Sequence, residues 1–370
     1  MEKIRILHVI ENLSLNNGVN SVVMNYYKYI DKERFAFDFM VHENVPRETE
    51  NYFLHRGSKV YAMPELKVSN MAVYIKALFK FFRQHPEYKI VHGHLPNAAV
   101  FYLGTARLFH VPVRIIHSHN ERSADTTVKK IRNNLLNSLI PCVANYYMAC
   151  SENSARFLFG KRADQAFILT NAIDTSKFSY SEETRYKVRN ELNLSQNQFV
   201  LGHVGRFCPQ KNHSFIIDVF REICALKPDS WLLLIGDGEL MPMIKNKIKD
   251  LGLSGNVIFT GISDRVHEYL QAMDAFILPS LFEGFPVSAV EAQMTGLPCY
   301  LSDTITSQAA LSDKTVFLNI KDSPSLWAEK IMSSYCKNDK RETVKNPEFD
   351  IRVQVKRLEA LYSDLYGKTK

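Results

Sequence analysis

The sequence lacks several features that mark specialised classes of protein. Its six cysteines are scattered along 370 residues and none forms a C-x-x-C pair, so neither a disulfide framework nor a zinc-binding cysteine motif is expected. No apolar run approaches the roughly 18 residues that span a bilayer, and the first one, residues 4–10, is too short for the apolar core of a signal peptide. No repeat of solenoid length is present. These absences favour a reduced, cytoplasmic protein.

The length and the pattern of apolar segments predict two α/β domains. A domain usually takes about 100–200 residues, so 370 residues fit two of them. Short apolar runs, typical of strands buried on both faces, alternate with longer amphipathic runs, and this alternation predicts parallel sheets. The expected strands are 4–10, 35–41, 59–62, 90–92, 114–117, 146–149 and 166–169 in the first half, and 199–204, 231–235, 257–260, 275–278, 299–301 and 316–318 in the second.

A polar, charged stretch between about residues 171 and 198 interrupts this series and indicates a connection between domains. We therefore expect a Rossmann-like domain over residues 1–175, a second over 196–345, and a C-terminal helix over 346–370 that packs back toward the first domain. The two domains should face each other across a cleft lined by the loops that follow the strands, because such sheets bind ligands at the carboxyl ends of their strands.

The positive charge lies in the first half of the chain. Residues 1–180 hold 23 Lys and Arg against 15 Asp and Glu, whereas the remainder holds 23 against 24. This excess indicates an anionic partner, such as a membrane surface, a lipid phosphate or nucleic acid, or simply a basic soluble surface. The apolar helix expected over 73–83 has a basic edge, and Lys129, Lys130 and Arg132 add charge, so peripheral membrane contact is one interpretation and a core helix is the other. Nucleic-acid binding is disfavoured because no binding module is recognisable.

Two cations lie on a short loop between an expected strand and an expected helix. The loop reads Gly205-Arg-Phe-Cys-Pro-Gln-Lys-Asn212 and contains Arg206 and Lys211. A helix start offers free N–H groups and the positive end of the helix dipole, which suit a diphosphate. A guanidinium can bridge two phosphate oxygens, while an ammonium acts as a point charge. The placement predicts a phosphate-binding loop rather than solvated surface charge.

Two carboxylates follow another expected strand. Glu283 precedes Gly284, where backbone can approach a ligand closely, and Pro286 is expected to open a helix. Glu291 lies one or two turns inside that helix, in the nearly apolar segment Val-Ser-Ala-Val-Glu-Ala, where a carboxylate needs a partner. Both carboxylates could accept hydrogen bonds from sugar hydroxyls, although an ordinary helix glutamate is the simpler interpretation of Glu291 alone.

These segments, in their order along the chain, resemble the retaining GT-B glycosyltransferases of family 4, also called glycosyl transferases group 1. Glu283-Gly-Phe-Pro…Glu291 matches the family's E-x7-E pattern, and the 205–212 loop matches its phosphate-binding loop. Thr170–Phe178 resembles the family's P-N-G-V-D-x-x-x-F motif, with Thr170 and Ala172 in place of Pro and Gly. Further likenesses are Cys150-Ser-Glu152, Val91-His-Gly-His94 and the loop 16–20, which has Asn17-Gly18 for the usual Gly-Gly and Asn20 for an acidic residue.

The resemblance implies a role for each matching position. Arg206 and Lys211 would neutralise the donor diphosphate, Glu283 would hold the transferred sugar, and Glu291 would bind the ribose. His119 would contact the sugar, with His117 as its rival and a structural strand-end residue as the alternative. The remaining donor-binding candidates are Gly18, Gly205, Gly261, Ile262, Gly284, Phe285, Pro286 and Val287, of which Gly261 and Ile262 would meet the base.

The activity so implied is transfer of a hexose or N-acetylhexosamine, with retention, from a nucleotide-sugar, preferably a UDP-sugar, to a glycan or lipid-linked acceptor in surface polysaccharide synthesis. No D-x-D motif lies in a plausible metal-binding loop, so neither a metal nor another cofactor is expected. A nucleotide-sugar epimerase and a non-catalytic glycan-binding subunit remain alternatives. An NAD-dependent oxidoreductase is disfavoured, because the loop after the first strand lacks G-x-G-x-x-G.

Overall fold

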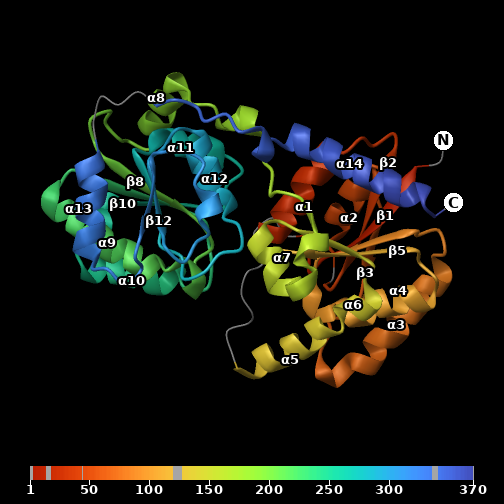
Figure 1. Ribbon diagram of the computed structural model, residues 1–370. Coiled ribbons are helices and arrows are strands. Elements are labelled where there is room, and N and C mark those ends of the chain that lie inside the picture. Colours follow the sequence, from red (N-terminus) through yellow and green to blue (C-terminus); the bar gives the residue numbers. More distant parts are fainter. Residues whose placement is uncertain (1–2, 14–17, 44, 120–126, 336–340, 370) are drawn as a thin grey trace. The chain divides into compact units, whose positions relative to one another are not determined.

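The computed structural model describes residues 3–13, 18–43, 45–119, 127–335 and 341–369, which form two compact units (Figure 1). Unit 1 comprises Met1–Ala172 together with Asp350–Lys370, and unit 2 comprises Ile173–Phe349. Each unit contains one sheet whose strands are all parallel. The predicted fold class, α/β with two Rossmann-like domains, is therefore confirmed.

Unit 1 contains a seven-stranded sheet in the order β3-β2-β1-β4-β5-β6-β7. Helices α1 and α14 pack together on one side of the sheet, and α3, α4 and α6 cover the other side (Figure 1). The strands are β1 (Ile4–Val9), β2 (Phe35–Val41), β3 (Val60–Ala62), β4 (Ile90–Gly93), β5 (Val113–Ser118), β6 (Tyr146–Ala149) and β7 (Phe167–Ile168). The helices are α1 (Gly18–Tyr29), α2 (Arg47–Leu54), α3 (Met71–Gln84), α4 (Ala99–Leu108), α5 (Thr127–Ser138), α6 (Ile140–Val143), α7 (Glu152–Phe159) and α14 (Ile351–Gly367).

The C-terminal helix α14 is part of unit 1 although nearly 180 residues of unit 2 precede it. Its apolar face, which includes Leu358 and Tyr362, is buried. Glu359 accepts a hydrogen bond from the backbone N–H of Asp31 at 2.9 Å, directly after α1. Tyr362 reaches the sheet itself, where its hydroxyl lies 2.7 Å from Nδ1 of His92.

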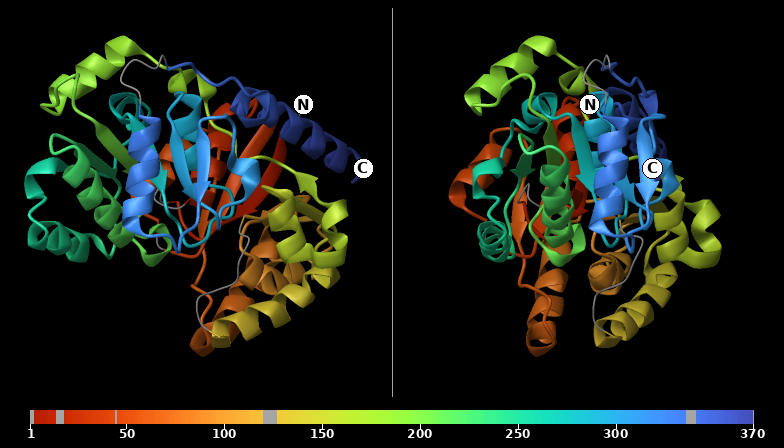
Figure 2. Two further views of the ribbon diagram at one scale, coloured as in Figure 1. Left: turned by 60° about the vertical axis from the view of Figure 1, so that its left-hand side comes forward. Right: turned by 90° about the vertical axis from the view of Figure 1, so that its left-hand side faces the viewer.

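Unit 2 contains a six-stranded sheet in the order β10-β9-β8-β11-β12-β13. Figure 2 gives two further views of the ribbon. The core of unit 2 includes Ile216, Leu234, Ile277 and Trp327, all fully buried. The strands are β8 (Val200–Val204), β9 (Trp231–Ile235), β10 (Val257–Gly261), β11 (Ala275–Leu278), β12 (Cys299–Ser302) and β13 (Thr315–Leu318). The helices are α8 (Glu182–Glu191), α9 (His213–Leu226), α10 (Met241–Asp250), α11 (Val266–Ala272), α12 (Val287–Met294) and α13 (Pro324–Ser334).

The stretch between about residues 171 and 198, which the sequence suggested was a connection between domains, belongs to unit 2 from Ile173 onward. The reason is a pair of arginines on α8. Arg185 and Arg189 donate to the two carboxylate oxygens of Asp274, each at 2.6 Å, and Asp274 lies directly before β11. Arg189 is completely buried, so these charge-assisted hydrogen bonds anchor α8 to the sheet.

The two strand orders correspond. Each sheet contains the doubly wound Rossmann order, in which the direction of strand addition reverses between the first and the fourth strand. The reversal lies between β1 and β4 in unit 1 and between β8 and β11 in unit 2. Ligands bind outside the carboxyl ends of the strands at such a point, which directs attention to the loops there.

Among the described helices, none combines the length and the apolar character that crossing a membrane requires.

Candidate active site

The loop after β8 contains both predicted phosphate-binding cations. It runs from Gly205 through a single helical turn, Pro209–Lys211, into α9. Asn212 adopts the left-handed conformation, with φ of 54°, and so turns the chain into the helix. Gly205 is required by close packing, because a Cβ there would lie 2.8 Å from Nε2 of His203.

Arg206 and Lys211 differ in their surroundings. The side chain of Arg206 is 57% exposed, and its guanidinium lies 3.6 Å from a carboxylate oxygen of Glu239. Glu239 follows β9 on a loop that the sequence reasoning missed. Gly236 on that loop has φ of 134°, and a Cβ there would lie 2.2 Å from the carbonyl oxygen of Gly205. A glycine just after an expected strand was the available signal for this second loop.

The loop after β11 is held directly against the loop after β8. The backbone N–H of Leu281 donates to the carbonyl of Gln210 at 2.8 Å, and the Gln210 side chain donates to the carbonyl of Phe282 at 2.9 Å. Nζ of Lys211 then donates to Oε1 of Glu283 at 2.7 Å. Both side chains are largely buried, with exposures of 16% and 8%. The structure thus brings together the two residues predicted to hold the diphosphate and the sugar.

The segment after Glu283 leads into α12. Phe285 is buried and its ring stacks on that of Phe349, with centroids 5.4 Å apart. Pro286 caps the helix and Val287 is its first residue, so Pro286 lies one position before the helix that it was predicted to open. Because proline lacks an N–H, it leaves no backbone donor unsatisfied at this point.

Glu291 lies in the second turn of α12 and is partly exposed. No hydrogen bond or ion pair joins its side chain to any residue in the described ranges. The surrounding protein desolvates the carboxyl group and raises its pKa to about 8. A carboxyl with a raised pKa and no protein partner is a common feature of binding sites.

The predicted base contact lies at the end of β10. Gly261 has φ of 69° and its carbonyl accepts a hydrogen bond from Gly236 at 2.9 Å, which ties this loop to the one after β9. Ile262 follows with 60% of its surface exposed. An exposed aliphatic side chain beside the phosphate-binding loops offers a flat apolar contact of the kind a base can use.

The two unit 1 candidates lie at the carboxyl edge of its sheet. Gly18 is the exposed first residue of α1, while its predicted neighbour Asn17 is outside the described residues. His119 directly follows β5 and is only 7% exposed. Burial lowers the pKa of its imidazole to about 3, so this ring is neutral at ordinary pH.

His119 belongs to a cluster of five buried histidines that the sequence reasoning did not assemble. His8 lies in β1, His92 and His94 at the end of β4, and His117 and His119 at the end of β5. Two sets of three, His8 with His92 and His94, and His94 with His117 and His119, each bring one nitrogen per ring within 4.8 Å of one another. Strand alternation was the available signal, because residues two apart on a strand share a face.

Comparisons with known proteins agree with this architecture. The profile of the family described as Glycosyl transferases group 1 matches residues 184–347. The putative glycosyltransferase EpsF of Bacillus subtilis is 32% identical over 92% of this chain and 90% of its own. The chain belongs to the glycosyl transferases group 1 family.

This glycosyltransferase is therefore a transferase enzyme, not the epimerase or binding subunit kept as alternatives. It is also 27% identical to the UDP-Gal:alpha-D-GlcNAc-diphosphoundecaprenol alpha-1,3-galactosyltransferase of Escherichia coli, over 98% of this chain and 97% of that one. The crystal structure of Anabaena HepE in complex with UDP-glucose has the same fold, with a TM-score of 0.78, 18% identity, and 97% and 99% of the two chains covered. The fold is that of the GT-B glycosyltransferases.

Proposed function

We propose that this glycosyltransferase moves a hexose or N-acetylhexosamine from a UDP-sugar, with retention of configuration, to a glycan or lipid-linked acceptor in surface polysaccharide synthesis. The observation that supports the proposal is the Lys211–Glu283 contact, which joins the cation predicted to bind phosphate to the carboxylate predicted to bind the sugar. Two similar proteins, a galactosyltransferase that uses UDP-galactose and a protein crystallised with UDP-glucose, support the choice of UDP.

Each candidate residue has a role in the proposed reaction. Lys211 and Arg206 neutralise the charge that develops on the leaving diphosphate, which is the task that a metal ion performs in other transferases. Glu283 holds hydroxyls of the transferred sugar, together with the backbone of Gly284 and Phe285. Glu291 binds the ribose. Positioning and electrostatics supply most of the rate enhancement.

Retention is assigned to a same-face reaction. The bond between the anomeric carbon and the diphosphate oxygen breaks, the acceptor oxygen bonds to the same face, and the departing phosphate takes the acceptor's proton. This route needs no carboxylate nucleophile, and none of the candidate carboxylates is required as one. We propose that no metal ion takes part.

A screen of nucleotides and nucleotide-sugars by thermal shift tests the donor. Ligands that bind the native protein stabilise it by mass action, by about 2.7 kcal/mol at one hundred times the dissociation constant. UDP and one UDP-sugar should raise the melting temperature more than GDP and ADP counterparts. Analysis of the product's anomeric configuration by NMR then tests retention. A preference for GDP or ADP, or an inverted product, would contradict the proposal.

We further propose that α5 attaches the protein to the cytoplasmic face of a membrane, where lipid-linked acceptors are found. Ile131 and Leu135, four residues apart on one side of this helix, are each 66% exposed, and Leu139 just beyond it is 43% exposed. Arg132 is exposed beside them, and the sequence places Lys129 and Lys130 in the first turn of α5. An apolar stripe with adjacent cations suits a bilayer that contains anionic lipid.

Liposome flotation tests this attachment. We expect the protein to float with vesicles rich in phosphatidylglycerol and to remain in solution with pure phosphatidylcholine. The double variant Ile131→Ser/Leu135→Ser should lose flotation. Leu226→Ser, which replaces a 59% exposed leucine in unit 2, is the matched control and should float like the wild type. Equal flotation of all three proteins would exclude α5 as the contact.

A further inference from the structure

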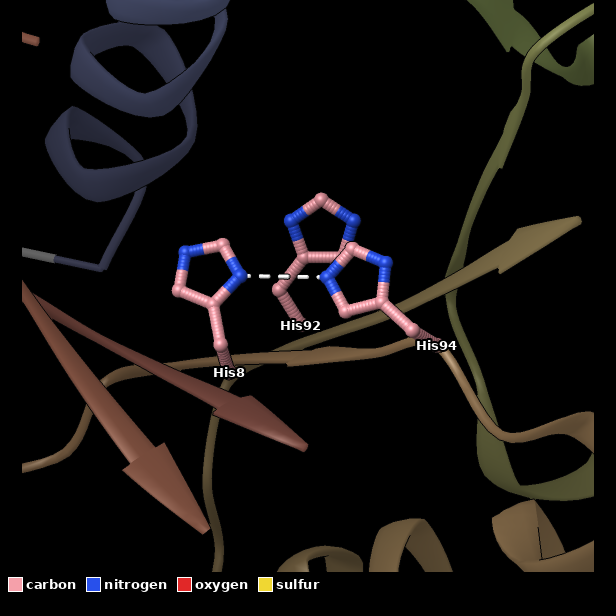
Figure 3. A group of neighbouring side chains, drawn as sticks. All are labelled: His8, His92 and His94. Atoms are coloured by element: carbon pink, nitrogen blue, oxygen red, sulfur yellow. Dashed lines mark hydrogen bonds between the residues drawn. The ribbon is translucent and has the colours of Figure 1, made fainter. Parts of the chain in front are cut away.

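The five buried histidines of unit 1 lie where its strand order reverses. His8 and His92 are neighbours in the registered pairing of β1 with β4, and His94 follows on the same face (Figure 3). The five histidine rings and Tyr362 of α14 line a cavity of about 10 Å³, which has room for about one water molecule. Ligands of a doubly wound sheet bind at this edge.

Three of the rings form a hydrogen-bonded chain that ends at His119. Nδ1 of His8 lies 3.1 Å from Nε2 of His94, and the dashed line in Figure 3 marks this hydrogen bond. Nδ1 of His94 in turn lies 2.8 Å from Nε2 of His119. At both steps the Nδ1 atom of one ring faces the Nε2 atom of the next, so the chain has a single direction.

Burial keeps every ring of the chain neutral. Desolvation lowers the pKa of His8 and of His119 to about 3 and lowers that of His94 well below its usual value. Each neutral imidazole carries one proton, on either Nδ1 or Nε2, and accepts at the other nitrogen. Because the chain has one direction, both hydrogen bonds form only when all three protons are on Nδ1 or all three are on Nε2. Any mixed arrangement places two protons or two lone pairs face to face.

The two arrangements differ in where they leave an unpaired N–H. Among the described residues neither Nε2 of His8 nor Nδ1 of His119 has a hydrogen-bond partner. With all protons on Nε2, the unpaired N–H is on His8, which is 2% exposed and packs 4.1 Å from the ring of Phe37. With all protons on Nδ1, it is on His119, whose Nδ1 is also buried but lies at the edge of the sheet where ligands of this fold bind. A buried donor without an acceptor is unfavourable in either case, but only the N–H on His119 can gain an acceptor from a ligand at this edge, so a bound ligand favours the second arrangement.

We propose that His8 and His94 are positioning residues that hold His119 in the tautomer with its proton on Nδ1, where it donates a hydrogen bond to an oxygen of the substrate. That the substrate is a sugar rests on the proposed function, whereas the coupling of the three rings does not.

A second chain in the same cluster has a comparable construction. The hydroxyl of Tyr362 lies 2.7 Å from Nδ1 of His92, and Nε2 of His92 lies 3.2 Å from Nδ1 of His117. Burial raises the pKa of Tyr362 well above its usual value, so the hydroxyl keeps its proton and can donate it to His92. With the Tyr362 proton donated in this way, His92 donates from Nε2 to His117, whose own proton then lies on Nε2, an atom that is buried without a hydrogen-bond partner among the described residues. This arrangement couples the tautomer of His117 to the C-terminal helix.

Ring geometry favours hydrogen bonding over metal coordination in this cluster. The planes of His8 and His94 are within 15° of each other and their centroids are 5.4 Å apart, so the two facing nitrogens point directly at each other. A metal ion needs about 2.0–2.1 Å to each nitrogen, and it could enter this gap only if both rings turned. A metal ion bound by these histidines would therefore contradict the hydrogen-bonded chain, and the experiment below includes a measurement of bound metal.

Nitrogen NMR of the full chain with ¹⁵N-labelled histidine reads the tautomers directly, and His119→Gln assigns the His119 signals. In the wild type we expect His8, His94 and His119 each to show a pyrrole-type Nδ1 and a pyridine-type Nε2. His8→Asp places an acceptor without a proton opposite Nε2 of His94 and should reverse the chain, so that Nδ1 of His119 becomes pyridine-type. His42→Asn is the matched control, because His42 contacts Ile10 and Tyr74 outside both chains, and should leave His119 unchanged.

Several outcomes would overturn the coupling. Mixed tautomers among the three rings in the wild type would do so without any variant, which decides the question even if His8→Asp does not fold. An unchanged His119 signal in folded His8→Asp would also do so. Stoichiometric zinc or another transition metal in the purified protein, measured by plasma mass spectrometry, would replace the hydrogen-bonded chain with a metal site.

Kinetics separate this inference from the proposed function. In His8→Asp we expect the affinity for UDP to stay within about threefold of the wild type, while turnover with the UDP-sugar falls about tenfold, the scale of one lost hydrogen bond to the substrate. If wild-type protein binds no UDP, the proposed donor is wrong, but the NMR result for the three rings still stands.

Discussion

Nζ of Lys211 lies 2.7 Å from Oε1 of Glu283, and this contact joins two loops that are 72 residues apart in the sequence. The loops follow β8 and β11, the strands between which the order of the unit 2 sheet reverses. Lys211 thus has a carboxylate partner before any diphosphate is present. A donor that brings negative charge must share or displace that partner, which makes the pair sensitive to substitution on either side.

Lys211→Ala should lower the turnover number. The loss should correspond to roughly 2–4 kcal/mol of transition-state stabilisation, the scale of one lost electrostatic donor. The proposed reason is that Lys211 neutralises the leaving diphosphate. Steady-state kinetics with the UDP-sugar found in the donor screen would measure the loss. Lys227→Ala is the matched control, because Lys227 pairs with Asp229 at 2.9 Å, away from these loops. Near wild-type turnover of Lys211→Ala would remove the phosphate assignment.

Glu283→Gln separates sugar binding from phosphate binding. The variant keeps the size of the side chain and should bind UDP with an affinity within about threefold of the wild type. The rate of sugar transfer should fall by an amount equivalent to roughly 1.5–3 kcal/mol of activation free energy, the scale of a hydrogen bond to a charged group. Calorimetry with UDP and with the intact UDP-sugar would compare the two affinities. An equal loss for both ligands would show that Glu283 acts on the nucleotide or on Lys211, not on the sugar.

Glu291 should release a proton when UDP binds at pH 7. Its raised pKa of about 8 means that most molecules hold a protonated Glu291 at this pH before binding. If the ionised carboxylate accepts hydrogen bonds from both ribose hydroxyls, binding releases close to one proton and tightens as the pH rises toward 8. Calorimetry in buffers of different ionisation enthalpy counts the protons. Glu291→Gln should bind more weakly with no release, and a wild type that releases none would contradict this role.

Acid should destabilise the fold in the range from pH 6.5 down to about 3. The folded-state pKa of His8 and that of His119 are about 3, below the 6.5 of an unfolded histidine, so below pH 6.5 the unfolded chain binds protons that the native chain does not. Each such histidine costs about 1.4 kcal/mol of stability per pH unit in this range. Glu291 has a raised pKa, so between pH 8 and 4.5 it makes the native state more stable as the pH falls. It is a single group and offsets only part of the effect of the histidines.

Thermal unfolding followed at pH 7.5, 6 and 5 would check this dependence. We expect the midpoint to fall as the pH falls, and we expect His8→Leu to reduce the slope because one of the neutral rings is gone. A midpoint that is constant between pH 7.5 and 5 would contradict the presence of neutral buried histidines in the native state.

Transfer should not require a divalent metal ion. In the proposed mechanism Arg206 and Lys211 neutralise the diphosphate, and a metal there would compete with them for the same oxygens. Full activity in excess chelator, with no stimulation by added Mg²⁺ or Mn²⁺, is the expected result. A loss of activity that Mg²⁺ or Mn²⁺ restores would show that the two cations are insufficient.

Much of the fold could be predicted from the sequence because its strands are buried on both faces. Such strands are continuous apolar runs, and segments such as 35–41 and 231–235 were predicted at the bounds that the structure has. The short surface helix α2 was not predicted. Only Phe53 of its eight residues is buried, so no apolar stripe marks this helix in the sequence.

The candidate donor site was also visible in the sequence, because each of its loops follows a strand and contains charged residues or glycines at fixed spacing. The partners within it were not. Nothing local links Lys211 to Glu283, or Arg206 to Glu239, since those contacts depend on which strands lie side by side. Unit 2 begins earlier than the sequence predicted for the same reason. Arg189 on α8 is anchored by Asp274, which lies 85 residues further along the chain.

The sequence by itself determined the strand–helix alternation, the positions of the donor-site loops and the residues they contain, because these depend on local periodicity and on residue chemistry. Only the tertiary structure decided that five histidines from β1, β4 and β5 meet in one buried cluster, which Tyr362 of α14 completes. Parallel strands place their neighbours through crossovers dozens of residues long, and a C-terminal helix can return to the first domain. Contacts between residues so far apart in the sequence cannot be recognised from the residues next to them in the chain.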